Sequence, residues 1–101
     1  MSVEHGFHAT LTAQPGKRDE VIEFLLDAPS LTNDDCVVFL VGRSTTDPDV
    51  VHVTEGWTTA EAHSAFFATE EAQALVANLQ TLLAGESTYS AELPVGGKAA
   101  F

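Results

Sequence analysis

Apolar and polar residues alternate strictly along residues 6–13, and this period of two predicts a first β-strand with one apolar face. The apolar face carries Phe7, Ala9, Leu11 and Ala13, and the polar face carries His8, Thr10 and Thr12. The segment from Gln14 to Gly16 ends the alternation. We expect the apolar face to lie against the core of the protein.

The next two predicted elements are a helix and a buried strand. A broad apolar stripe at helical spacing predicts a helix from Pro15 to about residue 28, because Pro29 disfavours helical geometry at the preceding residue. Residues 36–41 then form a continuous apolar run, rich in β-branched side chains and closed by Gly42. This run predicts a second strand that is covered on both of its faces.

A strand that leads directly into a helix is predicted at residues 51–61. One face of this strand carries Val51, Val53, Glu55 and Trp57, and the other carries His52 and Thr54. The following residues have the S/T-x-x-E form of a capping box, in which Thr58 and Glu61 each satisfy a backbone N–H of the other. The single tryptophan is therefore expected at a strand-to-helix corner.

Two helical segments and a last strand complete the pattern. Helical spacing predicts a short helix at residues 59–67 and a longer one at residues 70–83. Thr69 is the expected N-cap of the second of these helices, and Gly85 is its expected C-cap. Weaker alternation at residues 87–93 predicts the last strand, and residues 44–49 predict a hairpin turn between the second and third strands.

The predicted fold is α+β, with the ferredoxin-like order β-α-β-β-α-β and a four-stranded antiparallel sheet that carries its helices on one face. A single domain is expected over residues 1–101, with ends at residues 1–5 and 94–101 that are flexible or depend on a partner. Because the second strand is apolar on both faces, the sheet face without helices needs another cover. A second copy of the chain is the simplest cover, so we expect a homodimer.

The composition restricts the partners of the chain. It has 15 acidic and 4 basic residues, and the resulting net charge of -11 disfavours binding to nucleic acids and to anionic membranes. No apolar run reaches the roughly 18 residues of a membrane span, and no signal-peptide pattern is visible, so we expect a cytoplasmic protein. The single cysteine, Cys36, follows two aspartates at the start of an apolar run, which favours a buried structural thiol over a catalytic one.

The helix side of the third strand carries the candidate binding surface. Trp57, Phe66 and Phe67 are expected to form an aromatic wall for a flat aromatic ligand. Phe7 and Ala9, on the neighbouring first strand, face the same side and are expected to contribute to it. The alternative is that Trp57 is only an anchor of the core.

Several titratable residues have two interpretations. His63 lies at the edge of the aromatic wall, where it is either a proton acceptor or a partly exposed helical histidine. For Glu55, a structural ion pair with Arg43 is favoured over a role as general base. His8 and His52 lie on neighbouring strands, but without a third ligand a hydrogen-bonded polar layer is favoured over a metal site. No metal or cofactor is expected.

Three motifs carry a resemblance to a known family. They are Pro15-Gly16-Lys17-Arg18-Asp19-Glu20 before the first helix, the Asp47-Pro48 turn, and Glu55-x-Trp57 followed by Thr59-x-Glu61-Ala62. In order and spacing they resemble the antibiotic biosynthesis monooxygenase (ABM) family over residues 6–83. The resemblance implies a dimeric α+β barrel of ferredoxin-like subunits, in which Trp57 takes the position of the family's strand-end tryptophan.

The ABM resemblance also implies an activity. The family includes small monooxygenases that oxidise anthrone-like or quinol substrates with molecular oxygen, often without metal, flavin or haem. We therefore expect a cofactor-independent monooxygenase acting on a small aromatic molecule, with His63 as the base. Two histidines of the family are replaced here by Phe66 and Glu71, so a non-catalytic dimer that binds a small molecule or serves in assembly is the alternative. The asparagine of haem-degrading relatives is replaced by Ala9, which argues against haem degradation.

Overall fold

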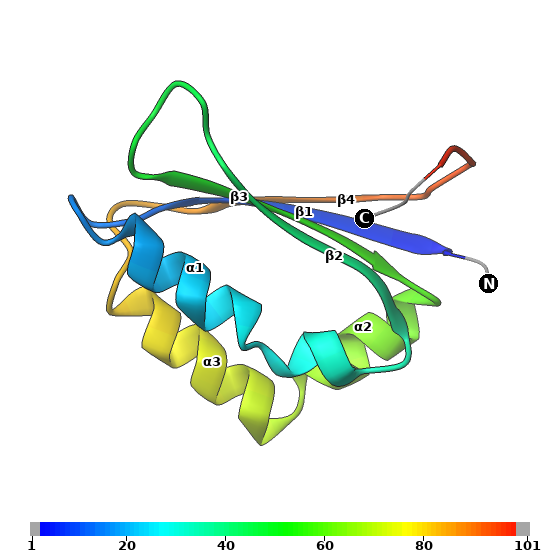
Figure 1. Ribbon diagram of the computed structural model, residues 1–101. Coiled ribbons are helices and arrows are strands. Elements are labelled where there is room, and N and C mark those ends of the chain that lie inside the picture. Colours follow the sequence, from blue (N-terminus) through cyan, green and yellow to red (C-terminus); the bar gives the residue numbers. More distant parts are fainter. Residues whose placement is uncertain (1–2, 99–101) are drawn as a thin grey trace.

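The computed structural model describes residues 3–98, and its elements follow the predicted order (Figure 1). The strands are β1 (His5–Thr12), β2 (Cys36–Arg43), β3 (Val50–Trp57) and β4 (Thr88–Glu92). The helices are α1 (Arg18–Leu26), α2 (Ala60–Phe67) and α3 (Glu70–Gln80), with a short 3-10 helix, η1 (Pro29–Thr32), after α1. Residues 1–2 and 99–101, which belong to the ends expected to be flexible, lie outside the described residues.

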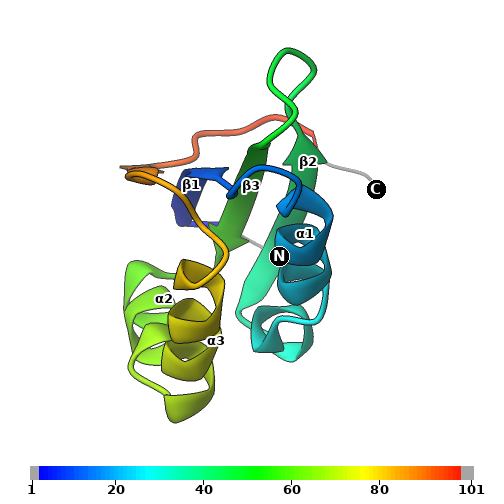
Figure 2. The same cartoon turned by 90° about the vertical axis from the view of Figure 1, so that its left-hand side faces the viewer.

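The strands form one antiparallel sheet in the order β2-β3-β1-β4. The helices α1, α2 and α3 all lie on one face of this sheet (Figures 1 and 2). The predicted ferredoxin-like α+β fold is therefore confirmed, and the predicted neighbours β1 and β3 pair with Ala9 opposite Val53 and Phe7 opposite Glu55. This register brings the helix-side residues of the two central strands together.

The buried apolar residues form two clusters between the sheet and the helices. The larger cluster contains Ala9, Leu11, Ala13, Val21, Ile22, Leu25, Val51, Val53 and Leu79. The smaller cluster contains Trp57, Phe66 and Ala72. Full burial of an aliphatic or aromatic side chain stabilises a fold by about 1.5–3 kcal/mol, so the larger cluster supplies most of the hydrophobic stabilisation.

Helix α2 begins one residue later than the capping-box pattern predicted. Its N-cap is Thr59, whose hydroxyl oxygen accepts a hydrogen bond from the Ala62 N–H at 3.0 Å. The Thr58 hydroxyl instead donates to Oδ1 of Asp35 at 2.7 Å. The predicted pairing of Thr58 with Glu61 was therefore wrong, because the Thr58 side chain is engaged by the segment before β2.

The end of α3 also differs from the prediction, although the N-cap Thr69 is confirmed. The helix ends at Gln80, and Gly85 lies beyond it with a positive φ of 68° in the loop toward β4. After the helix, the chain turns to pair with the end of β1, where the Gln14 N–H donates to the Leu82 carbonyl at 2.8 Å. This pairing ends the helix before its apolar pattern does.

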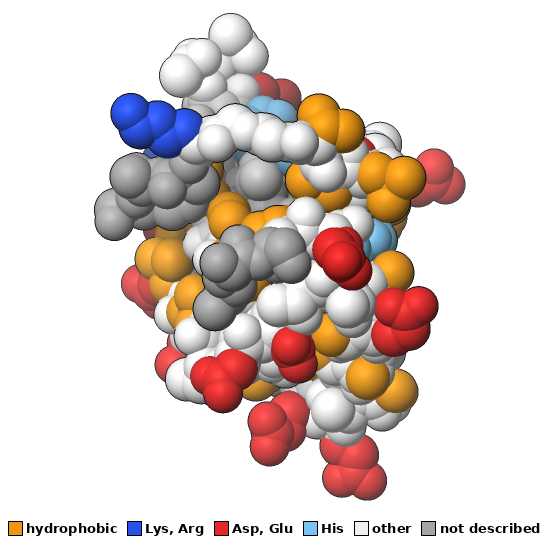
Figure 3. Space-filling view, turned by 90° about the vertical axis from the view of Figure 1, so that its right-hand side faces the viewer, with side chains coloured by type: hydrophobic (Ala, Val, Ile, Leu, Met, Phe, Trp, Pro, Cys, Tyr) orange, Lys and Arg blue, Asp and Glu red, His pale blue; other side chains and the backbone are white. Residues whose placement is uncertain are grey.

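Among the charged side chains on the face in Figure 3, acidic ones predominate. Figure 3 shows Asp and Glu spread over the helical part of one face, whereas Lys and Arg appear only near its upper edge. This distribution agrees with the net charge of -11. None of the helices within residues 3–98 combines the length and the apolar character needed to cross a membrane.

Candidate active site

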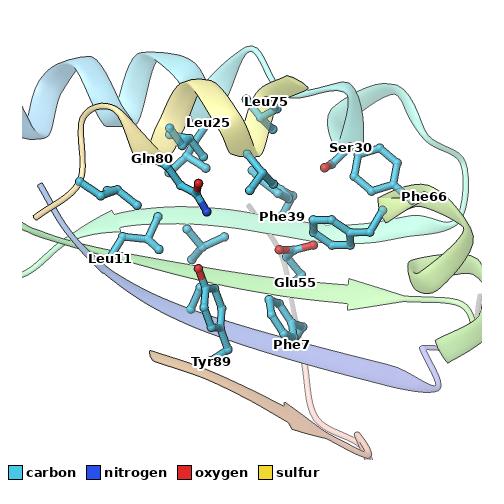
Figure 4. Close-up of a pocket in the computed structure, with 16 residues that line it drawn as sticks. Phe7, Leu11, Leu25, Ser30, Phe39, Glu55, Phe66, Leu75, Gln80 and Tyr89 are labelled. Atoms are coloured by element: carbon cyan, nitrogen blue, oxygen red, sulfur yellow. The ribbon is translucent and has the colours of Figure 1, made fainter. Parts of the chain in front are cut away.

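A cavity of about 90 Å³ lies between the helix side of the sheet and the helices (Figure 4). Its walls are mostly apolar, and the polar side chains that line it are Ser30, Glu55, Gln80 and Tyr89. Among the described lining residues, Glu55 is the only one with a carboxyl group. An apolar cavity with few polar groups is typical of a small-molecule site.

Glu55 faces the cavity because β3 alternates, which places this residue on the same side as Val53 and Trp57. Only 7% of Glu55 is exposed, and its Oε1 accepts a hydrogen bond from Nε1–H of Trp57 at 2.9 Å. Burial raises the pKa of the Glu55 carboxyl, and the indole hydrogen bond offsets part of this effect. A carboxylate with a raised pKa is a better proton acceptor near neutral pH than an ordinary surface glutamate.

Helix α2 places His63 beside Glu55. Nε2 of His63 is 3.9 Å from Oε1 of Glu55, and this buried nitrogen makes no hydrogen bond. The other ring nitrogen, Nδ1, is 3.0 Å from Nε2 of His5 at the start of β1. Burial lowers the pKa of His63, and the neighbouring His5 lowers it further, so the imidazole is neutral at neutral pH.

Aromatic rings surround the imidazole of His63. Its ring centroid lies 4.9 Å from Phe7, 5.1 Å from Trp57 and 4.9 Å from Phe67. His63 is 8% exposed, so the interpretation as a partly exposed helical histidine was wrong. The imidazole does not itself line the cavity, but Phe7 and Phe67, which do, pack against it.

The residues of the expected binding surface separate into two groups. Phe7, Ala9, Phe66 and Phe67 all line the cavity. Trp57 is completely buried, is not among the lining residues, and uses its indole N–H for Glu55. This placement does not support the expected stacking role of Trp57, because its ring is already enclosed by the core.

The expected ion pair between Glu55 and Arg43 was wrong. Arg43 lies at the exposed end of β2, and its Nη2 is 3.2 Å from Oδ1 of Asp19 on α1. Glu55 is paired with Trp57 instead. The two residues were expected to meet because Arg43 was the cation nearest in sequence, but β2 and β3 are paired so that Arg43 lies opposite Val51.

His5 and Tyr89 were missed in the sequence, as was Phe39 of the cavity wall. His5 belongs to β1, and extending the alternation of Phe7 and Ala9 by two residues would have placed it on the helix side. Tyr89 lies on β4 opposite Ala9 in the pairing register, and its ring stacks on Phe7 at a centroid distance of 5.8 Å. The weak alternation of the last strand gave little indication of this position.

The opposite face of the sheet carries the other two histidines. Oγ1 of Thr10 is 3.3 Å from Nδ1 of His52, and His8 pairs with Glu92. Within residues 3–98, no group of three or more His, Cys, Asp or Glu side chains is arranged to hold a metal ion. The contacts of His8 and His52 agree with the polar layer that was favoured over a metal site.

Comparison with known proteins places this fold in a family. The profile of the family described as antibiotic biosynthesis monooxygenase matches residues 5–78. The chain belongs to the antibiotic biosynthesis monooxygenase family. No curated protein is similar enough to the chain to give a match.

Solved structures of the ABM type share the whole fold. A candidate antibiotic biosynthesis monooxygenase from Chloroflexus aurantiacus is 29% identical, with a TM-score of 0.84 over 94% of this chain and 96% of that one. Another from Caulobacter crescentus is 26% identical, with a TM-score of 0.84 over 93% and 92% of the two chains. A protein of unknown function from Nitrosomonas europaea, 19% identical with a TM-score of 0.80 over 98% and 96%, shares the fold.

The two positions where this ABM chain departs from the expected family histidines differ in their surroundings. Phe66 is buried and lines the cavity, whereas Glu71 is exposed on α3. A phenyl ring at position 66 makes the cavity wall apolar where a histidine would make it titratable. Glu55, with His63 beside it, is therefore the titratable pair nearest to the cavity in this ABM protein.

The thiol of this ABM chain has the properties expected of a structural cysteine. Cys36 packs against the smaller apolar cluster. Burial, together with the negative charge of Glu55, raises its pKa to about 11. Because the thiolate is the nucleophilic form, Cys36 is a poor nucleophile at neutral pH.

Proposed function

We propose that this ABM protein oxidises an aromatic quinol or an anthrone-like substrate with molecular oxygen in the cavity beside Glu55. The observation that carries the proposal is a buried carboxyl group with a raised pKa in an otherwise apolar cavity, with a neutral His63 imidazole 3.9 Å away. A protein that needed only stability would gain by filling this position with an apolar side chain.

The chemistry begins with transfer of a substrate proton to the Glu55 carboxylate. For an anthrone-like CH₂ group, the resulting carbanion transfers electrons to oxygen and forms a carbon–oxygen bond. Loss of water then leaves a carbonyl group, so one CH₂ and one O₂ give one C=O and one H₂O. The substrate itself is the reductant, and the reaction as proposed needs no bound cofactor.

Aromatic side chains would hold the substrate next to the carboxyl group. Phe7 and Phe66 line the cavity on either side of Glu55 in Figure 4. Phe67 and Tyr89 also line it and are 37% and 62% exposed, so they can move without disturbing the core. Edge and face contacts between such rings and a flat substrate stabilise binding by about 0.5–1.5 kcal/mol for each pair, beyond the area that they bury.

Oxygen uptake tests this proposal. We expect the wild-type protein to consume oxygen when it is given reduced naphthoquinones or anthrones, and Glu55→Gln to lower the rate by about 10²-fold or more, as is usual for loss of a general base. Glu61→Gln is the matched control, because Glu61 is exposed on α2. Equal rates for wild type and Glu55→Gln would remove Glu55 from the reaction.

The small size of the cavity favours a second candidate, a dimer that binds a small molecule without catalysis. Its volume of about 90 Å³ is below the roughly 300 Å³ at the lower end of typical ligand pockets. A titration that follows Trp57 fluorescence distinguishes the two functions, because Trp57 donates to Glu55 and contacts Phe66. Saturable quenching by a quinol without oxygen uptake would favour the non-catalytic binder.

A haem does not fit the described site. The cavity of about 90 Å³ is far smaller than a porphyrin ring system requires. His63, the only helical candidate for an axial ligand, is not on the cavity wall, and its Nδ1 is within hydrogen-bond distance of His5. Haem degradation is therefore not proposed for this protein.

We further propose that the chain forms a homodimer through the sheet face that lacks helices (Figure 1). On β2, Val38 and Leu40 lie opposite Gly56 and Thr54 in the register, which places them on this face, and Leu40 is 42% exposed. Burying such residues against a second copy removes apolar surface from water. Analytical ultracentrifugation at micromolar concentration tests the dimer, and a monomeric sedimentation coefficient would contradict it.

A further inference from the structure

The hydrogen-bonded pair of His5 and His63 connects the candidate site to the N-terminal end of β1. Nε2 of His5 and Nδ1 of His63 are 3.0 Å apart, and the ring centroids are separated by 4.8 Å. His5 is the first residue of β1 and is half-buried, whereas His63 is buried. One of these two nitrogens must carry the shared proton, and this choice fixes the tautomer of His63.

The opposite nitrogen of His63 faces the carboxyl group. Nε2 is buried without a hydrogen bond, and Oε1 of Glu55 is 3.9 Å away. If Nε2 carries the ring proton, His63 can only donate toward Glu55. If Nδ1 carries it, the Nε2 lone pair can accept a hydrogen bond from a protonated Glu55. The two tautomers therefore give His63 opposite roles toward the same carboxyl group.

Burial around the pair favours the second arrangement. It raises the pKa of Glu55 and lowers the pKa of His63, so a proton that the Glu55 carboxylate has taken up stays on the carboxyl, beside a neutral imidazole. A protonated Glu55 needs an acceptor, and Nε2 of His63 is a buried atom without another partner. The charge of Glu55 also acts on Cys36 of β2, whose pKa is about 11, so the thiol stays protonated.

We infer that His5 is a positioning residue, which accepts a hydrogen bond from Nδ1–H of His63 and thereby presents the Nε2 lone pair of His63 to Glu55. After Glu55 has taken a proton from the substrate, its O–H faces an acceptor, the Nε2 lone pair of His63, which favours the protonated carboxyl. A base oriented by a third group is a recurring arrangement in active sites. The inference rests on the proposed function only for its use in catalysis.

The tautomer of His63 can be measured without a substrate, by ¹⁵N NMR of protein labelled at histidine. In the wild-type protein we expect Nδ1 of His63 to be protonated and Nε2 to be unprotonated at neutral pH. His5→Phe fills the space but cannot accept a hydrogen bond, so His63 should change to the Nε2–H tautomer and donate toward Glu55. His5→Gln offers a carbonyl oxygen as acceptor and should retain the wild-type tautomer. His8→Phe, on the same strand but the opposite face, should change nothing.

The same variants give a kinetic result in the oxygen-uptake assay. His5→Phe should lower the rate by about tenfold, with partial recovery in His5→Gln, because general acid–base groups contribute about 10²–10⁴-fold in total. In His5→Phe, the acid limb of the pH–rate profile should also move to lower pH, because the Nε2–H of His63 would donate toward Glu55 and favour its carboxylate form.

Two results would overturn the inference: an Nε2–H tautomer of His63 in the wild-type protein, or a tautomer that stays the same in His5→Phe. If the wild-type protein consumed no oxygen with any quinol or anthrone, the proposed function would fail, but the NMR result would still decide the role of His5. Thermal denaturation of each variant identifies any that has lost its fold, and His5→Gln tests the inference if His5→Phe does not fold.

Discussion

The two ends of the core differ in chemistry although they lie between the same sheet and the same helical layer. At the end covered by α1, the buried residues are apolar, with Val21 and Val51 completely enclosed. At the end covered by α2, the buried Trp57 lies beside two titratable groups, Glu55 and His63. Burying such groups reduces stability, and the first end shows that this fold can be filled without them. The difference makes the α2 end the part of the core where a functional site is proposed.

The largest effect on stability is expected at the apolar end. Ile22→Ala removes a buried side chain of α1 that does not line the cavity, and it should lower the free energy of unfolding by about 2–5 kcal/mol. Urea denaturation followed by circular dichroism measures the loss. Oxygen uptake per folded molecule should be unchanged, and a large fall in that rate would show that the two ends are not independent.

At the polar end, Trp57→Phe should have a smaller but pH-dependent effect. It removes the indole N–H that Glu55 accepts, which costs about 1–3 kcal/mol for a buried acceptor, in addition to the volume lost. Since the indole hydrogen bond lowers the pKa of Glu55, its loss raises that pKa further. The destabilisation should therefore be larger at pH 7 than at pH 5, when both are measured by urea denaturation. If the loss in the free energy of unfolding were the same at both pH values, the substitution would have removed only packing contacts.

Glu55→Gln should separate the cost of the buried charge from the other interactions. A carboxyl whose pKa is raised on folding contributes stability below its unfolded pKa, and this contribution is lost as the pH rises through the folded pKa. Gln keeps an oxygen for Trp57 but does not titrate. The stability of the variant relative to wild type should increase with pH above the ordinary range of glutamate, by about 1.4 kcal/mol for each unit by which the pKa is raised. A constant difference across that range would contradict a raised pKa.

The smallest effect is expected for Arg43→Ala. This residue forms an exposed ion pair with Asp19, and such pairs contribute less than about 1 kcal/mol. Oxygen uptake and its pH dependence should not change. If the pH profile shifted in Arg43→Ala, Arg43 would interact electrostatically with Glu55, although Arg43 pairs with Asp19 and Glu55 pairs with Trp57.

The sheet and its faces could be predicted from the sequence because alternation fixes which side chains share a side. The strand pairs, the helix-side position of Glu55 and the N-cap Thr69 all followed from local patterns. The N-cap of α2 was misplaced by one residue because Thr58 and Thr59 are equally suitable chemically. Only the fold shows that Asp35 binds the first of them.

The candidate site was predicted less completely, because its contacts join residues far apart in the chain. His5 and His63 are separated by 58 positions, and sequence spacing gives no sign of their contact. The partner of Glu55 was misassigned for the same reason, since the nearest cation in sequence is not the nearest donor in space. Phe7, Phe66 and Phe67 were recognised and line the cavity, whereas Phe39 and Tyr89 were missed. Which rings face the cavity and which are enclosed depends on packing, as the buried Trp57 demonstrates.

The most direct test of the central claim is the pH dependence of kcat/KM for oxygen consumption in wild type, Glu55→Gln and Glu61→Gln. If Glu55 accepts the substrate proton, wild type should show an acid limb with an apparent pKa above that of an ordinary glutamate, because burial raises the pKa of this carboxyl. Glu61→Gln should keep that limb, and the residual activity of Glu55→Gln should lack it. The same acid limb in Glu55→Gln as in wild type would contradict the account, because the proton would then be taken by another group.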